Sequence, residues 1–293
     1  MTRSLRARVV GRLREREDER APRISFTASD APLERGSPIF IIGAQRSGTS
    51  LLRRILDSHS RIAGPPETKY LLPLTEILRD RKALMGLDSL GYDRTDVAAA
   101  LAELGRSFLD GYAKAQGKAR WAEKTPNYVD CLSELWELYG EAGGLFVLIV
   151  RHGLDVAASL SDPHRHYPAI DPYLEDAGGD KRVAAGLFWA DKTRKIVEFK
   201  RVHPDSCFEI RYEELTVSPE NALKPLFSFL AEEWEPDVID YSRFSHHEGF
   251  GDPDVKRRRR IEPNSGRYSR WPSETQLAVK QACGPLLEEL GYE

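Results

Sequence analysis

Short runs of consecutive apolar residues alternate along the chain with longer segments in which apolar side chains recur every three or four positions. The first pattern is typical of strands buried on both faces of a sheet, and the second of amphipathic helices. We predict strands over residues 39–42, 62–63, 120–123, 145–150 and 207–211, and helices starting near residue 50 and over 67–79, 95–115, 128–139, 180–203, 219–230 and 273–290. This alternation indicates an α/β fold with a central parallel sheet flanked by helices.

Two predicted connectors differ from the rest in length and composition. Residues 80–94 have the character of a loop, and residues 161–179 are rich in Pro, Asp, Gly, His and Tyr, with enough length for a substrate lid. Between these connectors, the helix at 95–115 has apolar residues at a spacing that predicts its buried face: Val97, Leu101, Leu104, Phe108 and Tyr112.

Composition and charge narrow the class of protein. Of the 293 residues, 41% are hydrophobic, which is enough for a sizeable core, and the net charge of −3 argues against a nucleic-acid partner. No apolar run approaches the roughly 18 residues of a membrane span, so we expect no stable membrane insertion. Residues 1–36, which are rich in Arg, are predicted to form a flexible basic arm before one domain over residues 37–293.

The cysteine content indicates a reducing compartment. Cys131, Cys207 and Cys283 lie far apart and form no C-x-x-C pair. An odd, sparse count of this kind favours three buried thiols over a disulfide scaffold or a zinc site. We therefore expect a cytoplasmic protein.

The clearest chemical signal follows the first predicted strand. Gly43 and Gly48 have the spacing of a phosphate-binding P-loop, G-x-x-x-x-G-K-[ST], but Thr49 stands where the lysine is expected. Backbone N–H groups of such a loop and the following helix N-terminus bind anions, with hydroxyls from Ser47, Thr49 and Ser50 in support. Arg46 supplies a guanidinium suited to phosphate or sulfate.

A nucleotide kinase would also need a carboxylate that holds magnesium, often at the end of a second buried strand. The strand at 145–150 ends in Arg151 and His152 instead of Asp. The chain therefore has phosphate ligands without an evident metal ligand. A kinase that uses ATP, a nucleotide-binding protein without catalysis, and a plain strand-to-helix turn stay open as alternatives.

These two motifs, in this order, resemble those of the sulfotransferases that use 3′-phosphoadenosine-5′-phosphosulfate (PAPS). Pro38–Ser50 is similar to their 5′-phosphosulfate loop, and Val147–Leu160 to their 3′-phosphate motif, in which Arg151 and Ser159 occupy the ligand positions. The resemblance implies a single P-loop-like domain, PAPS as donor, adenosine 3′,5′-bisphosphate as product, and no metal. Smaller matches favour the tyrosylprotein and carbohydrate branch, in a soluble bacterial form.

Further residues receive roles from the same resemblance. The segment Pro66-Glu67-Thr68-Lys69 is similar to the family segment that carries the catalytic base, at the position of Glu67. The segment Glu123-Lys124-Thr125-Pro126 is similar to the one that carries a catalytic lysine, and Lys124 is expected to contact the bridging oxygen. Arg46 is expected at the 5′-phosphate or the sulfuryl group. Each has a simpler interpretation: Glu67 as a helix-start residue in a salt bridge, and Lys124 as a surface lysine. The rival bases are His152, His164 and His166.

The remaining predicted ligands lie near the C-terminal half. Tyr212 is similar to a tyrosine near the adenine, although it fits equally a core aromatic, and Arg151 could form a structural strand-end salt bridge. Arg270 and one or two cations of the run at 256–260 are expected to reach phosphate. The acceptor stays open among small molecules, glycans and peptides, with a hydroxyl, phenol or amine as the reacting group. The oligomeric state is also open, with a homodimer as one option.

Overall fold

The computed structural model describes residues 36–249 and 259–292. The predicted basic arm, apart from Gly36, and residues 256–258 of the basic run lie outside the described residues. Within them, no helix combines the length and apolar character that crossing a bilayer requires. Cys131, Cys207 and Cys283 are buried free thiols, as predicted.

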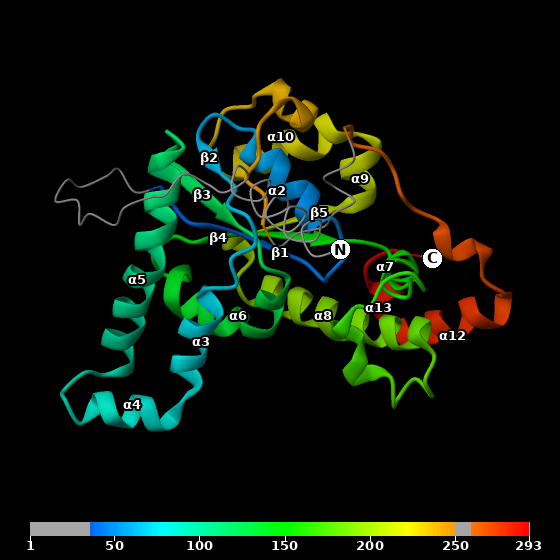
Figure 1. Cartoon of the computed structure of the whole chain (residues 1–293), viewed down its shortest axis with the longest axis horizontal. Coiled ribbons are helices and arrows are strands. Elements are labelled where there is room, and N and C mark those ends of the chain that lie inside the picture. The colour runs from blue at the N-terminus through cyan, green and yellow to red at the C-terminus, as the bar shows by residue number, and fades with distance from the viewer. Residues whose placement is uncertain (1–35, 250–258, 293) are drawn as a thin grey trace, which may run out of the picture.

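A parallel sheet forms the centre of the molecule (Figure 1). Its strands are β1 (Ile39–Ile42), β2 (Ile62–Ala63), β3 (Arg120–Glu123), β4 (Leu145–Val150) and β5 (Cys207–Arg211), in the spatial order β2-β3-β1-β4-β5. β1 pairs with β4 through Ile39 opposite Leu145 and with β3 through Ile39 opposite Ala122. The predicted α/β class, parallel sheet and strand positions are confirmed.

Helices cover both faces of the sheet. The described helices are α2 (Thr49–Asp57), α3 (Leu71–Arg79), α4 (Arg81–Asp88), α5 (Arg94–Ala115), α6 (Leu132–Leu135), α7 (Gly153–Leu160), α8 (Lys181–Val202), α9 (Tyr212–Val217), α10 (Pro219–Phe229), α12 (Ser273–Cys283) and α13 (Leu286–Glu289). Short 3₁₀ turns are η1 (Pro126–Cys131), η3 (Pro168–Tyr173), η4 (Pro204–Ser206), η5 (Pro236–Arg243) and η6 (Arg267–Arg270), and η2 (Trp136–Gly140) is a π-turn. Figure 1 shows α2, α9 and α10 on one side of the sheet and α3, α6 and α8 on the other.

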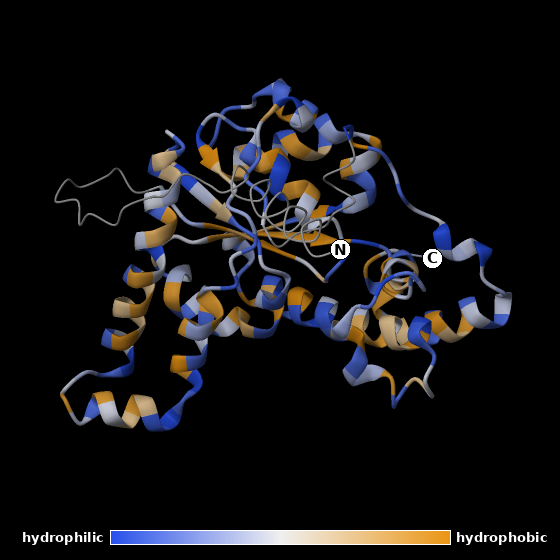
Figure 2. Ribbon diagram, viewed as in Figure 1, coloured by the Kyte–Doolittle hydropathy of each residue, from blue (hydrophilic) through white to orange (hydrophobic). Residues whose placement is uncertain are grey.

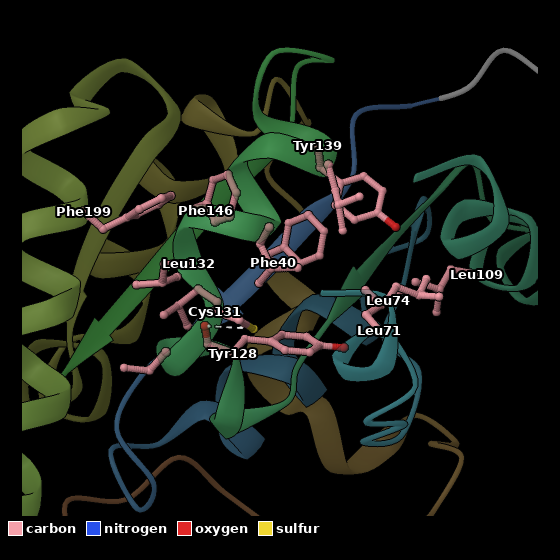
Figure 3. Close-up of a cluster of buried hydrophobic side chains, with 14 of the residues drawn as sticks. Phe40, Leu71, Leu74, Leu109, Tyr128, Cys131, Leu132, Tyr139, Phe146 and Phe199 are labelled. Carbon is pink, nitrogen blue, oxygen red and sulfur yellow. Dashed lines mark hydrogen bonds between the residues drawn. The ribbon is translucent and has the colours of Figure 1, made fainter. Parts of the chain in front are cut away.

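Alternating residues of β1 supply the two cores. Ile39 and Ile41 pack into the cluster under α2 and α10, whereas Phe40 and Ile42 pack into the cluster with α3, α5 and α8. Figure 3 shows Phe40 at the centre of the second cluster, where its ring lies 5.3 Å from Phe146 and 5.1 Å from Tyr139. Figure 2 shows the hydrophobic residues concentrated along the central strands. Because both faces of β1 and β4 are buried, these two strands are continuously apolar.

A third cluster joins α7, α8, α12 and α13 beside the end of β4. Its largest member, Trp189 of α8, is fully buried and donates from Nε1 to the carbonyl oxygen of Arg151 at 3.0 Å. This hydrogen bond fixes the backbone at the residue that follows β4.

Several predicted elements need correction. Residues 80–94 contain α4, which Asp80 caps through hydrogen bonds from the N–H groups of Lys82 and Ala83, so most of this segment is no loop. The helix predicted from Glu67 begins only at Leu71, because Lys69 has a left-handed backbone with φ 58°. The helix predicted over 128–139 is a succession of 3₁₀, α and π turns, and the C-terminal helix breaks at Gly284.

The predicted buried face of α5 is wrong in part. Leu104 and Phe108 are 47% and 54% exposed, while Gly105 and Leu109 are among the residues that face the core. The stripe is rotated by one position because Gly105 lets the hydroxyl of Tyr139 approach the helix; a Cβ at this position would lie 2.0 Å from that oxygen.

Candidate active site

The predicted site residues follow the strands of the parallel sheet, whose carboxyl ends share one edge. Glu67 comes after β2, Lys124 after β3, the glycine-bounded loop after β1, Arg151 after β4 and Tyr212 after β5. Strand order therefore lines up these five segments in space, with the loop in the middle. Neighbouring strands lie about 4.8 Å apart, so the Lys124 and Arg151 positions flank the loop on either side at roughly one strand spacing.

The loop over residues 43–50 has the geometry of an anion cradle. Gly48 has φ 101° and precedes α2 without a side-chain cap, so the loop presents the N-terminal N–H groups of the helix. A Cβ on Gly48 would lie 2.5 Å from the Tyr212 ring, which leaves room only for glycine. Ser47 and Thr49 are buried and Ser50 is half-buried. The structure thus contains the predicted strand, loop and helix in the predicted order.

Three predicted anion ligands meet beside this loop. Arg46, whose φ is 74°, donates from Nε to Ser159 Oγ at 2.8 Å. Arg151 donates from Nη1 to the carbonyl oxygen of Arg46 at 3.0 Å. The Arg46 guanidinium also lies 5.6 Å from the ring centre of Tyr167, in the connector that follows α7. Arg46 therefore lies on the Arg151 and Ser159 side of the loop.

Arg151 is a buried cation at the strand end. It is 4% exposed, its guanidinium lies 4.2 Å from the centre of the Tyr212 ring, and it also donates to the carbonyl of Asn264. Burial lowers the pKa of Arg151, opposed by the neighbouring Tyr212 and Asp155. Arg151 Nε is buried and has no hydrogen-bond partner among the described residues. Its N–H group is therefore available to donate to an anion.

Tyr212 has a supporting position in this arrangement. It is 3% exposed and belongs to the core under α10, with Gly48 against its ring edge and Arg151 over its face. The sequence left a core aromatic and a residue near the adenine equally open. Its burial beneath Arg151 and the loop agrees with a core aromatic, and its place near the adenine stays a prediction.

On the other side of the loop, Glu67 and Lys124 form an ion pair. Lys124 Nζ lies 2.8 Å from Glu67 Oε2, and Lys69 Nζ lies 3.5 Å from Oε1. Lys124 is only 2% exposed, so its interpretation as a surface lysine is wrong. Burial lowers the pKa of Lys124, while the charge of Glu67 and its hydrogen bond raise it. Glu67 is not a helix-start residue, because α3 begins at Leu71.

Glu123 is a component of the site that sequence analysis missed. The last residue of β3, it is fully buried, and burial raises its pKa to about 7. Its Oε1 accepts hydrogen bonds from Thr68 at 2.9 Å and Thr125 at 3.1 Å. The available signal was a carboxylate inside a strand that is otherwise buried, directly before the candidate lysine.

The rival residues take other places. His152 accepts from the N–H of Leu154 as the cap of α7 and stacks on Tyr268, whereas His164 and His166 are exposed in the connector after α7. Arg270 is exposed in η6, where Arg267 contacts Asp155 through its backbone N–H. The described residues contain no group of three or more His, Cys, Asp and Glu side chains placed to hold a metal ion.

Comparison with known proteins identifies relatives of the chain. A model described as the sulfotransferase family matches residues 38–236. Nodulation protein NoeE of Sinorhizobium fredii is 28% identical over 286 residues, which cover 87% of this chain and 65% of that protein. Protein-tyrosine sulfotransferase A of Caenorhabditis elegans is 24% identical, with 94% of this chain and 73% of the relative covered.

Solved structures share the fold. The sulfotransferase domain of the Synechococcus PCC 7002 olefin synthase superposes with a TM-score of 0.59 at 21% identity, over 92% of this chain and 99% of that one. The sulfotransferase domain from the curacin biosynthetic pathway gives a TM-score of 0.56 at 23% identity. Among curated relatives, the chain spans 65% of the nodulation protein and 26% of an uncharacterised protein of Aquifex aeolicus.

Proposed function

The chain belongs to the sulfotransferase family, and on that premise we propose that it transfers a sulfuryl group from PAPS to an acceptor hydroxyl, phenol or amine with Glu67 as the general base. The observation that carries the proposal is the order of the site along the sheet edge. Candidate anion ligands lie on one side of the loop, and a carboxylate paired with a buried ammonium lies on the other.

The anion ligands fit a donor with two separated phosphates. The loop N–H groups with Ser47, Thr49 and Ser50 would hold the 5′-phosphate, as the P-loop geometry supports. Arg151, with its unpartnered buried Nε, and Ser159 would hold the 3′-phosphate, which ATP lacks. Arg46 contacts Ser159 and would join the two phosphate positions. Arg270 is a further candidate if η6 closes over the nucleotide.

The Glu67–Lys124 pair suits the bond-making step. The acceptor oxygen or nitrogen attacks sulfur, its proton passes to the Glu67 carboxylate, and the bond from sulfur to the bridging oxygen breaks to release adenosine 3′,5′-bisphosphate. An ammonium has three N–H donors, so Lys124 can hold Glu67 and stabilise charge on the bridging oxygen together. The 2.8 Å contact keeps the base and the ammonium next to each other.

The acceptor class follows less directly. The relatives include protein-tyrosine sulfotransferases and a nodulation protein, and we extend to this chain only the transfer of a sulfuryl group. Tyr70, just beyond Glu67, makes an edge contact with exposed Phe108 at 5.5 Å. Aromatic rings this close in sequence to the candidate base favour an acceptor with an apolar or ring-shaped body, such as a phenol or a sugar.

Calorimetry with adenosine 3′,5′-bisphosphate tests the donor. We expect it to bind at least tenfold more tightly than AMP, without added divalent ions, and Arg151→Lys to reduce that ratio because a lysine lacks the guanidinium fork. Equal affinity for both nucleotides would refute the assignment of the 3′-phosphate site.

Transfer of labelled sulfate from PAPS, screened over phenols, sugars and tyrosine peptides, tests the base. Glu67→Gln keeps the shape of the side chain and removes its basicity. It should leave the affinity for adenosine 3′,5′-bisphosphate within twofold and lower turnover by about 10²–10⁴. Undiminished turnover would remove Glu67 as the base, and the three histidines would be tested next.

A further inference from the structure

Glu123 connects the two segments that carry the candidate catalytic pair. Its Oε1 accepts from the hydroxyl of Thr68, which follows Glu67, and from the hydroxyl of Thr125, which follows Lys124. One carboxyl oxygen thus joins the loop after β2 to the end of β3, next to the 2.8 Å ion pair.

The same threonines hold the backbone around that pair. Thr125 Oγ1 accepts from the N–H of Lys69, and Thr68 Oγ1 accepts from the N–H of Tyr70, each at 3.4 Å. Lys69 is held at φ 58°, a conformation that costs a residue with a side chain about 1 kcal/mol or more. The segment that presents Glu67 is therefore locked in place by side chains outside the reacting pair.

Glu123 is also expensive to bury. It is 0% exposed, and its Oε2 makes no hydrogen bond of normal geometry among the described residues, although the Tyr128 hydroxyl lies close enough to influence its pKa. An apolar residue of the same size would fill this space at the strand end without that cost. Glu123 lies next to the candidate catalytic pair and accepts hydrogen bonds from the segments that carry both of its members. Its carboxyl group is therefore better explained by a role in positioning that pair than by a contribution to core stability.

We propose that Glu123 is a positioning residue of the transfer reaction, whose carboxyl group holds Glu67 and Lys124 in register through Thr68 and Thr125. The inference rests on the proposed function. Glu123 itself does not touch the donor or the acceptor. It acts on the rate by keeping the general base and the ammonium aimed at the same reacting oxygen.

Three variants separate positioning from packing. Glu123→Met fills the space and removes the acceptor oxygen, Glu123→Gln retains an oxygen for both threonines, and Glu232→Met is the matched control. Glu232 is a buried carboxylate at the opposite end of β3, where it pairs with Arg120 at 3.2 Å, far along the strand from the site. Folded fractions are measured by chemical denaturation, so rates refer to folded enzyme.

We expect Glu123→Met to lower kcat at least 30-fold with KM for PAPS and affinity for adenosine 3′,5′-bisphosphate within twofold of the original. Glu123→Gln should recover most of that rate, and Glu232→Met should lose stability with kcat unchanged. A normal kcat for folded Glu123→Met, or a loss that Gln does not recover, overturns the proposal.

Thr68→Val keeps the experiment decisive if Glu123→Met fails to fold. Thr68 is half-buried, so losing its hydroxyl disturbs the core less. The same fall in kcat with unchanged nucleotide affinity is expected, and a normal kcat counts against the proposal. Failure of the proposed function has a separate signature: the unaltered chain then transfers no sulfate in the acceptor screen, although it folds and binds nucleotide.

Discussion

Replacing Gly48 by alanine probes the contact between the loop and its support. At φ 101°, any residue with a Cβ pays about 1–2 kcal/mol for the left-handed backbone. The new Cβ would also lie 2.5 Å from Tyr212 Cδ2 and 3.2 Å from Ile149 Cδ1, an overpacking that costs about 1–3 kcal/mol. We expect Gly48→Ala to lower the free energy of unfolding by about 2–5 kcal/mol in total.

The same substitution should weaken nucleotide binding. The Tyr212 ring must move to admit the Cβ, and the Arg151 guanidinium lies 4.2 Å above that ring. We expect affinity for adenosine 3′,5′-bisphosphate to fall at least tenfold, or about 1.4 kcal/mol, by calorimetry.

Gly86→Ala is the control for this prediction. Gly86 lies in α4 with no atom near its added Cβ, so alanine should stabilise the protein by about 0.5–1 kcal/mol and leave binding unchanged. A Gly48→Ala protein with stability within 1 kcal/mol of the original and unchanged affinity would refute the reasoning.

Three further predictions concern the pair, the buried acid and the core. On the proposed function, Lys124→Met should reduce kcat by about 10²–10³ in the PAPS assay, because the variant lacks the ammonium proposed to stabilise charge on the bridging oxygen. Burial raises the pKa of Glu123 from 4.5 to about 7, so its contribution to stability is complete below pH 4.5 and is lost as the pH rises through 7. Relative to Glu123→Gln, the free energy of unfolding of the unaltered protein should fall by about 3 kcal/mol over that pH range in urea titrations. Parallel pH profiles of the two proteins would contradict this prediction. Phe40→Ala should cost about 3–5 kcal/mol because Phe40 is fully buried, whereas Phe108→Ala, at a 54% exposed site, should stay within about 0.5 kcal/mol by the same titration.

The strands were the most predictable part of the fold. The limits predicted for β1 and β4 agree with the structure, because strands covered on both faces carry apolar runs that end abruptly at other residue types. Helix faces were less predictable. Gly105 admits the Tyr139 hydroxyl from a neighbouring element, and nothing in the local spacing of α5 encodes that contact.

The site was predictable as a set of residues but not as an arrangement. The loop and Arg151 were proposed from motifs with a fixed spacing, and Glu67 and Lys124 from the resemblance to a known family. The contacts of Arg46 with Ser159 and of Glu123 with two threonines join segments distant in sequence. Such contacts depend on which strands are neighbours, and the apolar pattern does not specify strand order.

If the proposed function is correct, the order of the strands in the sheet also sets the orientation of the bound donor. β1 lies between β3 and β4, so we expect a nucleotide whose 5′-phosphate occupies the loop and whose 3′-phosphate lies toward Arg151 to have its sulfuryl group on the Lys124 side. β2 is the edge strand beyond β3, and Glu67 follows it, so the acceptor must approach from the β2 side. The connector after α7 contacts Arg46 through Tyr167, on the nucleotide side. The segment that the sequence suggested as a substrate lid therefore lies on the nucleotide side, where we expect it to cover the donor, and we expect the residues after β2 and α5 to surround the acceptor.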